Sequence, residues 1–152
     1  MKQTCLNFSI LIIVLTIATQ SFANEAIGYF KKVNKAVSIV RGEKTISAKT
    51  GDSVCVNDII TTDHKGTAGI LLKDDTRLSI GPDTELLIDK YIYNPSKQRF
   101  SFISKITEGT LLFISGKISK RKPESVKINT PLGTIGIRGT RFLVKIDSDS
   151  QK

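Results

Sequence analysis

The chain has 152 residues, and its 23 Lys and Arg against 14 Asp and Glu leave a formal net charge of +9 at pH 7. That length suits a single domain with an ordinary hydrophobic core. One histidine and two cysteines are too few for a metal centre built from several imidazole and thiolate ligands. The positive charge predicts attraction to anionic surfaces or, more simply, lysines that solvate the outer faces of the fold.

Residues 1–23 have the pattern of a secretory signal peptide. Lys2 precedes the apolar run LNFSILIIVLTIA, and the small residues Ser21 and Ala23 stand where a cleavage site needs them. The apolar run is shorter than the roughly 20 residues that cross a bilayer as a helix, and an uncleaved N-terminal anchor is the alternative. We therefore expect a periplasmic or secreted single domain of residues 24–152, with no membrane span after cleavage.

Cysteine use excludes a disulfide within the exported chain. Cys5 leaves with the signal peptide, so Cys55 is the one cysteine that follows it. In the segment DSVCVND, Cys55 alternates with Val54 and Val56. Because neighbouring side chains of a strand point to opposite faces, we expect Cys55 to be half exposed.

After the signal, short apolar runs rich in Ile, Val, Thr, Phe and Tyr alternate with Gly, Asp, Asn and Pro. Turn signals recur at roughly the 8-to-12-residue spacing of β-sandwiches and barrels. The pattern predicts an all-β fold, a compact two-sheet sandwich or roll of many short strands. The expected strands are residues 37–40, 53–56, 58–62, 67–72, 76–80, 84–93, 99–106, 110–114, 125–129, 133–137 and 140–146.

Two adjacent segments, DTRLSIGP and DTELLIDK, resemble each other. Even spacing places Leu78 with Ile80, and Leu86 with Ile88, on one face of a strand. Gly-Thr pairs recur at 66–67, 109–110, 133–134 and 139–140. Since glycine permits a sharp corner and β-branched threonine favours a strand, these pairs predict corners at strand starts.

The segment NTPLGTIGIRGTRFLV, residues 129–144, is the candidate for a phosphate-binding loop. Its glycines lack the spacing of a P-loop or a dinucleotide fingerprint, and a strand follows it where an anion site would need a helix. We interpret it as structural. Pro131 marks an edge or turn, and Gly136 and Gly139 let the backbone kink. We expect Arg138 to clamp carbonyls or a carboxylate between strands, with a partner contact as the alternative.

Other catalytic or binding arrangements find little support. His64 lies in the turn DHKG without a nucleophile context. Asp52, Asp58 and the Asp74-Asp75 pair occupy turn positions, where aspartate tightens turns, and do not have calcium-loop spacing. We therefore expect no enzyme activity and no cofactor. The aromatic side chains are interpreted as core rather than as base-stacking platforms: Tyr29, Phe30, Tyr91, Tyr93, Phe100, Phe102, Phe113 and Phe142.

One dense cationic cluster lies in KISKRK, which reads as a loop before Pro123. Its basic residues are a candidate patch for an anionic partner: Lys117, Lys120, Arg121 and Lys122.

The order of these segments resembles the FecR domain. A Gly-Asp turn leads to an Asp-Ile-Ile-Thr strand, a pair of Asp-Thr strands follows, and the chain closes on the glycine-rich segment. The resemblance covers about residues 37–146. The motif positions that carry it are Gly51, Asp52, Asp58, Thr130, Pro131, Gly133, Gly136, Arg138, Gly139, Thr140 and Phe142.

The resemblance implies a compact β module that binds or transmits a signal without catalysis. Well-understood members of the family are transmembrane regulators of iron-uptake genes. They join a cytoplasmic sigma-factor-binding segment to a periplasmic FecR domain, which receives a signal from an outer-membrane receptor. We expect the present chain to lack the cytoplasmic segment and the region that follows the domain in those regulators.

From residues and resemblance together we expect an exported FecR-type binding or signal-relay module of a Gram-negative cell envelope. Its expected partner is an envelope protein or an anionic envelope polymer, and no nucleic acid. The alternative is a structural or adhesive envelope protein whose cationic surface holds the polymer.

Overall fold

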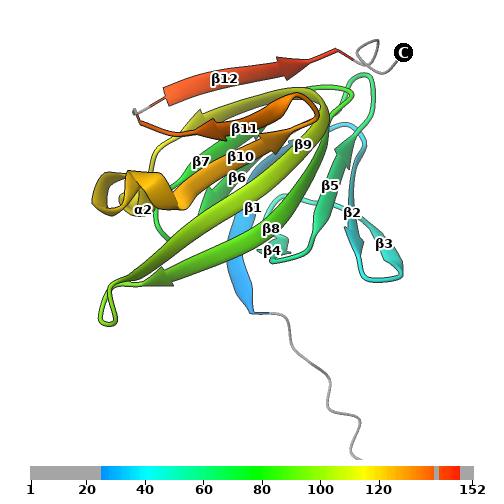
Figure 1. Cartoon of the computed structure of the whole chain (residues 1–152). Helices are drawn as coiled ribbons and strands as arrows, with labels where there is room; N and C mark the ends of the chain where they lie inside the picture. The colour runs from blue at the N-terminus through cyan, green and yellow to red at the C-terminus, as the bar shows by residue number, and fades with distance from the viewer. Residues whose placement is uncertain (1–24, 139–140, 148–152) are drawn as a thin grey trace, which may run out of the picture.

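A computed structural model of the chain describes residues 25–138 and 141–147, and these are almost entirely β-structure (Figure 1). The all-β expectation is therefore confirmed. The strands are β1 (Ala26–Asn34), β2 (Val37–Arg41), β3 (Lys44–Ser47), β4 (Ser53–Cys55), β5 (Ile59–Thr62), β6 (Thr67–Leu72), β7 (Arg77–Ile80), β8 (Glu85–Asn94), β9 (Arg99–Ile114), β10 (Val126–Thr130), β11 (Gly133–Gly136) and β12 (Arg141–Ile146). A short helix, α2 (Lys117–Arg121), and a 3₁₀ turn, Pro123–Ser125, join β9 to β10.

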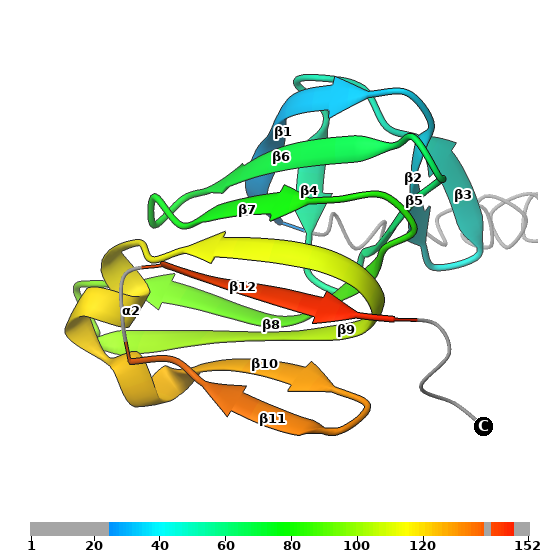
Figure 2. The ribbon, with the colours of Figure 1, turned by 90° about the horizontal axis from the view of Figure 1, so that it is seen from above.

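The strands form one curled, mainly antiparallel sheet. Neighbouring strands follow the order β3-β2-β5-β8-β9-β7-β6-β1-β4, and β10, β11 and β12 branch from β9. Figure 2 shows β1, β6 and β7 on one side of the curl and β8, β10 and β11 on the other. Because the hydrogen-bonded path is continuous through β9, the expected division into two sheets is not confirmed.

Strand β9 holds the two sides of the curl together. Residues 99–108 pair with β8, and within them 102–105 also pair in parallel with β10, whereas residues 109–114 pair with β12 and, from 111 on, with β7. The change of partners falls at Gly109, whose φ is +91°. The prediction of two strands, 99–106 and 110–114, was therefore wrong. Glu108-Gly109 bends a single strand where the sequence indicates a turn.

This division defines two parts of the fold, the β1 half and the β8 half. The β1 half comprises β4, β1, β6, β7, β12 and residues 109–114 of β9. The β8 half comprises β3, β2, β5, β8, β10, β11 and residues 99–108 of β9.

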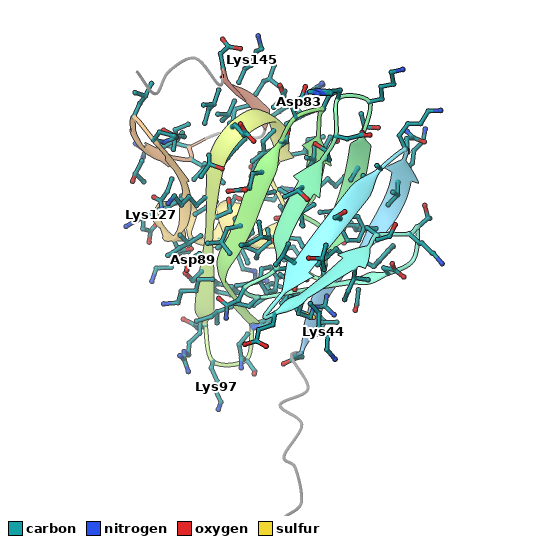
Figure 3. The ribbon with its side chains drawn as sticks, turned by 90° about the vertical axis from the view of Figure 1, so that its right-hand side faces the viewer. Lys44, Asp83, Asp89, Lys97, Lys127 and Lys145 are labelled. Carbon is teal, nitrogen blue, oxygen red and sulfur yellow. The ribbon has the colours of Figure 1, made fainter. Side chains whose placement is uncertain are left out.

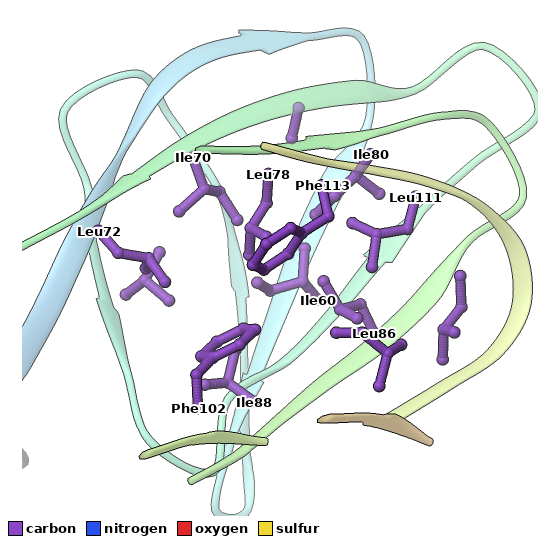
Figure 4. Packing of buried hydrophobic residues seen from close by; sticks show 14 of the residues in the cluster. Ile60, Ile70, Leu72, Leu78, Ile80, Leu86, Ile88, Phe102, Leu111 and Phe113 are labelled. Carbon is purple, nitrogen blue, oxygen red and sulfur yellow. The ribbon is translucent and has the colours of Figure 1, made fainter. Parts of the chain in front are cut away.

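The core fills the inside of the curl, with side chains from both halves (Figure 4). Leu78, Ile80, Leu86 and Ile88 are all buried, as the even spacing predicts. Phe102 and Phe113 pack at 5.8 Å between ring centroids and join the halves. Among the other aromatic residues, Phe30 is fully buried, Tyr91, Tyr93, Phe100 and Phe142 are partly buried against the core, and Tyr29 is 46% exposed.

Three local expectations were wrong. Strands β1 and β3 were not predicted. In β1 the register shifts between Phe30 and Lys32, so its side chains do not alternate regularly between the two faces. The first five residues of KISKRK form the helix α2, where a loop was expected, and Lys122 follows the end of that helix. Cys55 is 2% exposed; β4 ends at this residue, so strand alternation no longer applies to it.

Candidate functional site

The glycine-rich segment forms an exposed hairpin and an edge strand at one end of the fold (Figure 1). Strand β10 turns through Pro131-Leu132 into β11, which pairs with β10. The hairpin is closed by Thr130 Oγ1 donating to the Gly133 carbonyl at 2.9 Å. Thr134 Oγ1 donates to Asn129 Oδ1 at 2.8 Å and braces the two strands. The expected turn at Pro131 is thus present.

Two grooves flank this hairpin. One, of about 350 Å³, lies between the end of β11 and β12, and its lining includes Ile137, Arg138, Arg141 and Phe142. Ile137 is 5% exposed, so the groove has an apolar floor. Phe142 stacks on Phe113 at 5.1 Å between ring centroids and ties β12 to the core. The second groove, of about 280 Å³, lies on the other side of Ile137 and is lined by Pro123 and Glu124.

Large apolar side chains project from the same region into solvent. Leu132 at the hairpin tip is 86% exposed and Leu143 in β12 is 64% exposed. Among the described strands, β11 pairs only with β10 and β12 only with β9, so each leaves one edge of backbone groups open. Exposed edges and large exposed leucines together suit contact with another chain.

Arg138 does not act as the expected clamp within the described residues. Its side chain is exposed, and it makes no hydrogen bond or ion pair with any residue of 25–138 or 141–147. It instead lines both grooves. Arg138 follows the end of β11 and pairs with no strand of the described residues. Gly139 and Thr140 lie outside the described residues, so their predicted corner stays a prediction.

Asp58, which is buried, forms an ion pair with the partly exposed Arg41 that residue pattern alone did not reveal. Arg41 Nε and Nη2 each donate at 2.7 Å to one carboxylate oxygen of Asp58, which is fully buried. Nη2 also donates to the Ser53 carbonyl at 2.9 Å, and the Cys55 amide donates to Asp58 Oδ2 at 2.8 Å. The hydrogen bonds to Asp58 raise the pKa of Arg41. This motif aspartate therefore fastens β2 to β4 across the two halves.

Gly51 and Asp52 form the turn before β4. Gly51 has φ +96°, and its amide donates to the Phe30 carbonyl at 2.8 Å. Asp52 Oδ2 accepts the Lys49 amide at 2.8 Å, while its carbonyl accepts the Phe30 amide at 2.9 Å. For Asp52 the turn-tightening interpretation is right; for Asp58 it was incomplete, since that carboxylate is also a buried ion-pair partner.

Asp74 is a second buried carboxylate, and it positions α2. Its Oδ2 accepts the Thr76 hydroxyl at 2.7 Å and the Ile118 amide at 3.1 Å, and its carbonyl accepts the Lys117 amide at 2.7 Å. Tyr91 Oη donates to Asp74 Oδ1 at 3.1 Å and accepts the Asp74 amide at 2.9 Å. Burial and then the Asp74 charge raise the pKa of Tyr91 well above its ordinary range. Of these partners only Thr76 lies close to Asp74 in the sequence, so the sequence gives little indication of the cluster.

The cationic cluster on α2 is partly engaged within the fold. Lys117 Nζ pairs with Asp75 Oδ2 at 2.8 Å, and this hydrogen bond raises the lysine pKa. Arg121 lies over the Phe100 ring at 5.9 Å from its centroid. Lys120 and Lys122 are exposed and form no ion pair with residues of the described ranges. Two of the four basic side chains, Lys117 and Arg121, therefore already interact with neighbouring residues of the fold.

The remaining groups define no further chemical centre in the part of the chain that is described. His64 lies in its predicted turn and pairs with Asp83 at the surface. Burial raises the pKa of the Cys55 thiol. No group of three or more His, Cys, Asp or Glu side chains is placed to hold a metal among residues 25–138 and 141–147. The same residues contain no helix that is both long and apolar enough to cross a bilayer.

The described residues form a curled, mainly antiparallel β module with open strand edges, a form to which a partner strand can be added. Comparison with protein families identifies it further: residues 58–152 match the FecR protein family. The chain belongs to that family, which is one of regulatory and signalling proteins, and the resemblance drawn from its motifs is confirmed. Neither the curated proteins nor the solved structures searched contain a match.

Proposed function

We propose that this protein is a non-enzymatic, exported FecR-type module that binds an envelope protein and relays a signal at the periplasm or cell surface. Family membership supports the signalling role. The signal-peptide pattern of residues 1–23 supports export, and it lies outside the described residues.

The observation that carries the proposal is the open edge of β12 beside an exposed leucine. Strand addition to an open sheet edge gives a partner main-chain hydrogen bonds and a side-chain row to contact. Leu143 stands on β12 and lines the groove together with Arg138 and Arg141, and Leu132 is exposed at the tip of the neighbouring hairpin. A partner strand on this edge would cover apolar surface that the fold otherwise leaves in water.

The alternative, an envelope protein that holds anionic polymer through Lys117, Lys120, Arg121 and Lys122, has weaker support. Asp75 and Phe100 already engage Lys117 and Arg121. The open charge on α2 is therefore smaller than the sequence cluster indicates.

The test is capture from envelope extract at moderate salt with the tagged full chain and three variants. Leu143→Asp and Leu132→Asp place a charge on the proposed surface. Ile46→Asp is the matched control, because Ile46 is 39% exposed on the distant edge strand β3. We expect one protein to be retained by the wild type and the control, and lost with Leu143→Asp. Retention that no variant changes, or no retention at all, would contradict the proposal.

A further inference from the structure

The strands of the β1 half carry cations and no carboxylate. Strands β1, β4, β6, β7 and β12 and residues 109–114 of β9 contain no Asp or Glu. Their basic residues are Lys31, Lys32, Arg77, Arg141 and Lys145. Lys145 pairs with Asp147 just beyond its strand. Within residues 25–138 and 141–147, Lys31, Lys32 and Arg77 form no ion pair.

A bulge in β1 brings two of these cations to the same face. Phe30 pairs with Ile70 and Lys32 with Gly69, so Lys31 is the extra residue of the register shift. Both lysines are exposed, whereas Phe30 before them is fully buried. A regular strand would send one of two successive side chains inward. Because of the bulge, one residue of β1 has no partner in the β1–β6 ladder, and two lysines instead of one lie on the outer face.

A hollow lies beside the two lysines. Gly69 of β6 pairs with Ser79 of β7, so two small residues form its floor, and the hollow has a volume of about 300 Å³. Lys31, Lys32 and Arg77 line it together with Leu71. A side chain at Gly69 would meet only the Lys32 Cβ, at 3.9 Å, so the fold itself does not require glycine there.

Apolar side chains accompany the charges on this outer face. Tyr29 pairs across the ladder with Leu71 and is 46% exposed. Ile114 pairs with Arg77 and is half-buried. Tyrosine, aliphatic side chains and lysines on one flat face are the combination found where proteins meet a lipid–water interface.

We propose that the outer face of β1, β6 and β7 binds an anionic lipid surface, with a head-group phosphate seated between Lys31, Lys32 and Arg77. Cations without ion-pair partners attract phosphate through charge-assisted hydrogen bonds. An added peptide strand fits less well, because β6 is paired on both sides and its backbone groups are already used within the sheet. This inference is independent of the proposed relay, whose surface is the β12 edge.

The experiment is flotation of the full-length chain with vesicles of phosphatidylcholine alone or with 30 mol% phosphatidylglycerol, at about 0.05 and 0.15 M salt. Lys31→Gln/Lys32→Gln/Arg77→Gln removes the three charges. Gly69→Val fills the hollow without changing charge. Lys117→Gln/Lys120→Gln/Arg121→Gln is the matched control, since it removes an equal charge from α2. Melting temperatures verify that each variant is folded.

We expect binding to the anionic vesicles to fall more than about tenfold in the β1-half triple variant, several-fold in Gly69→Val, and less than about twofold in the α2 control. Equal losses in the two triple variants would show nonspecific attraction to net charge and overturn the proposal. So would equal binding to neutral vesicles, which an uncleaved apolar N-terminus would cause, or no binding at all. If polyglutamate displaces the protein with the same dependence on variants, the face binds an acidic chain and the lipid assignment is wrong.

Discussion

The two halves of the curl share one core and present different surfaces to solvent. Strands of the β8 half mix basic residues with Glu85, Asp89 and Glu108, whereas strands of the β1 half have basic residues alone. In Figure 3, Lys127 of β10 and Asp89 of β8 lie on the same side of the view, and Lys97 lies at the end of the β8–β9 hairpin. Mixed charges solvate a surface at little cost, but charges of one sign repel each other. The outer face of the β1 half carries basic residues alone, so an anionic partner bound there would relieve the repulsion between them.

Besides the shared core, three points fasten the halves to each other. Gly109 carries β9 from one half to the other, Asp58 fastens β2 to β4, and Asp74 joins β8 to α2. If the halves act as one cooperative unit, breaking any fastening point should lower the stability of both. Three substitutions, at Gly109, Asp58 and Tyr91, should lower the stability by successively smaller amounts.

Gly109→Val should be the most damaging. At φ +91° a β-branched residue is strained, and a Cβ there would lie 2.2 Å from Thr84 Oγ1 and 2.4 Å from the Asp83 carbonyl. We expect a loss of about 4 kcal/mol or more in the free energy of unfolding, or no folded protein. Urea unfolding measures it.

Gly42→Ala is the matched control, because Gly42 also has positive φ, +60°, with nothing within 4 Å of its added Cβ. It should cost only about 1 kcal/mol. Similar losses in the two variants would mean that the close approach of Thr84 to β9 contributes nothing beyond backbone strain.

Asp58→Asn should rank second. The change leaves the Arg41 guanidinium facing a neutral amide where it had two hydrogen bonds of 2.7 Å to a buried carboxylate. We expect a loss of about 2 to 3 kcal/mol, below the range for fully buried pairs because the Arg41 side chain is 30% exposed. Asp75→Asn, which breaks the exposed pair with Lys117, should leave the unfolding transition where it was. If Asp75→Asn lowered the free energy of unfolding more than Asp58→Asn, the expected ranking of the two ion pairs would be wrong.

The strands were predictable because their patterns are local. Alternation and turn residues place β2, β5, β6, β7 and β8 close to their observed bounds. The bulge at Lys31 removes the alternation of β1, and Glu108-Gly109 looks like a turn inside β9. In both cases a long-range pairing, absent from any short window, decides the local structure.

The fastening carboxylates were harder to foresee. Asp58 and Asp74 follow the residue pattern of ordinary turns, and their burial depends on Arg41 and Tyr91, each 17 residues away in the chain. The motif resemblance did single out Asp58, but as a family position without a physical role. For Arg138, the clamp was expected from the five donors of its guanidinium, and the side chain has no hydrogen-bond or ion-pair partner among the described residues.

Tyr91→Phe tests the third fastening point and should have the smallest effect at neutral pH. It removes two hydrogen bonds with Asp74, so we expect a loss of about 1 to 2 kcal/mol. Alkaline pH adds a sharper signature. Burial and Asp74 raise the pKa of Tyr91 above its ordinary value of 10.0, so the folded protein keeps this proton when the unfolded chain has lost it. Its contribution to stability is therefore complete below pH 10 and falls as the pH rises above it.

Stability curves between pH 8 and pH 11.5 should accordingly fall more steeply for the wild type than for Tyr91→Phe above about pH 10. Tyr29→Phe is the control, because it removes a tyrosine hydroxyl from the outer face of β1, away from Asp74. If both variants keep that slope, the alkaline loss has another source, and the Tyr91–Asp74 contact fastens α2 to β8 less firmly than its geometry implies. If only Tyr91→Phe makes the alkaline decline in stability shallower, the Tyr91 hydroxyl is its source. The hydrogen bond from Tyr91 to Asp74 then links the two halves in addition to their shared core.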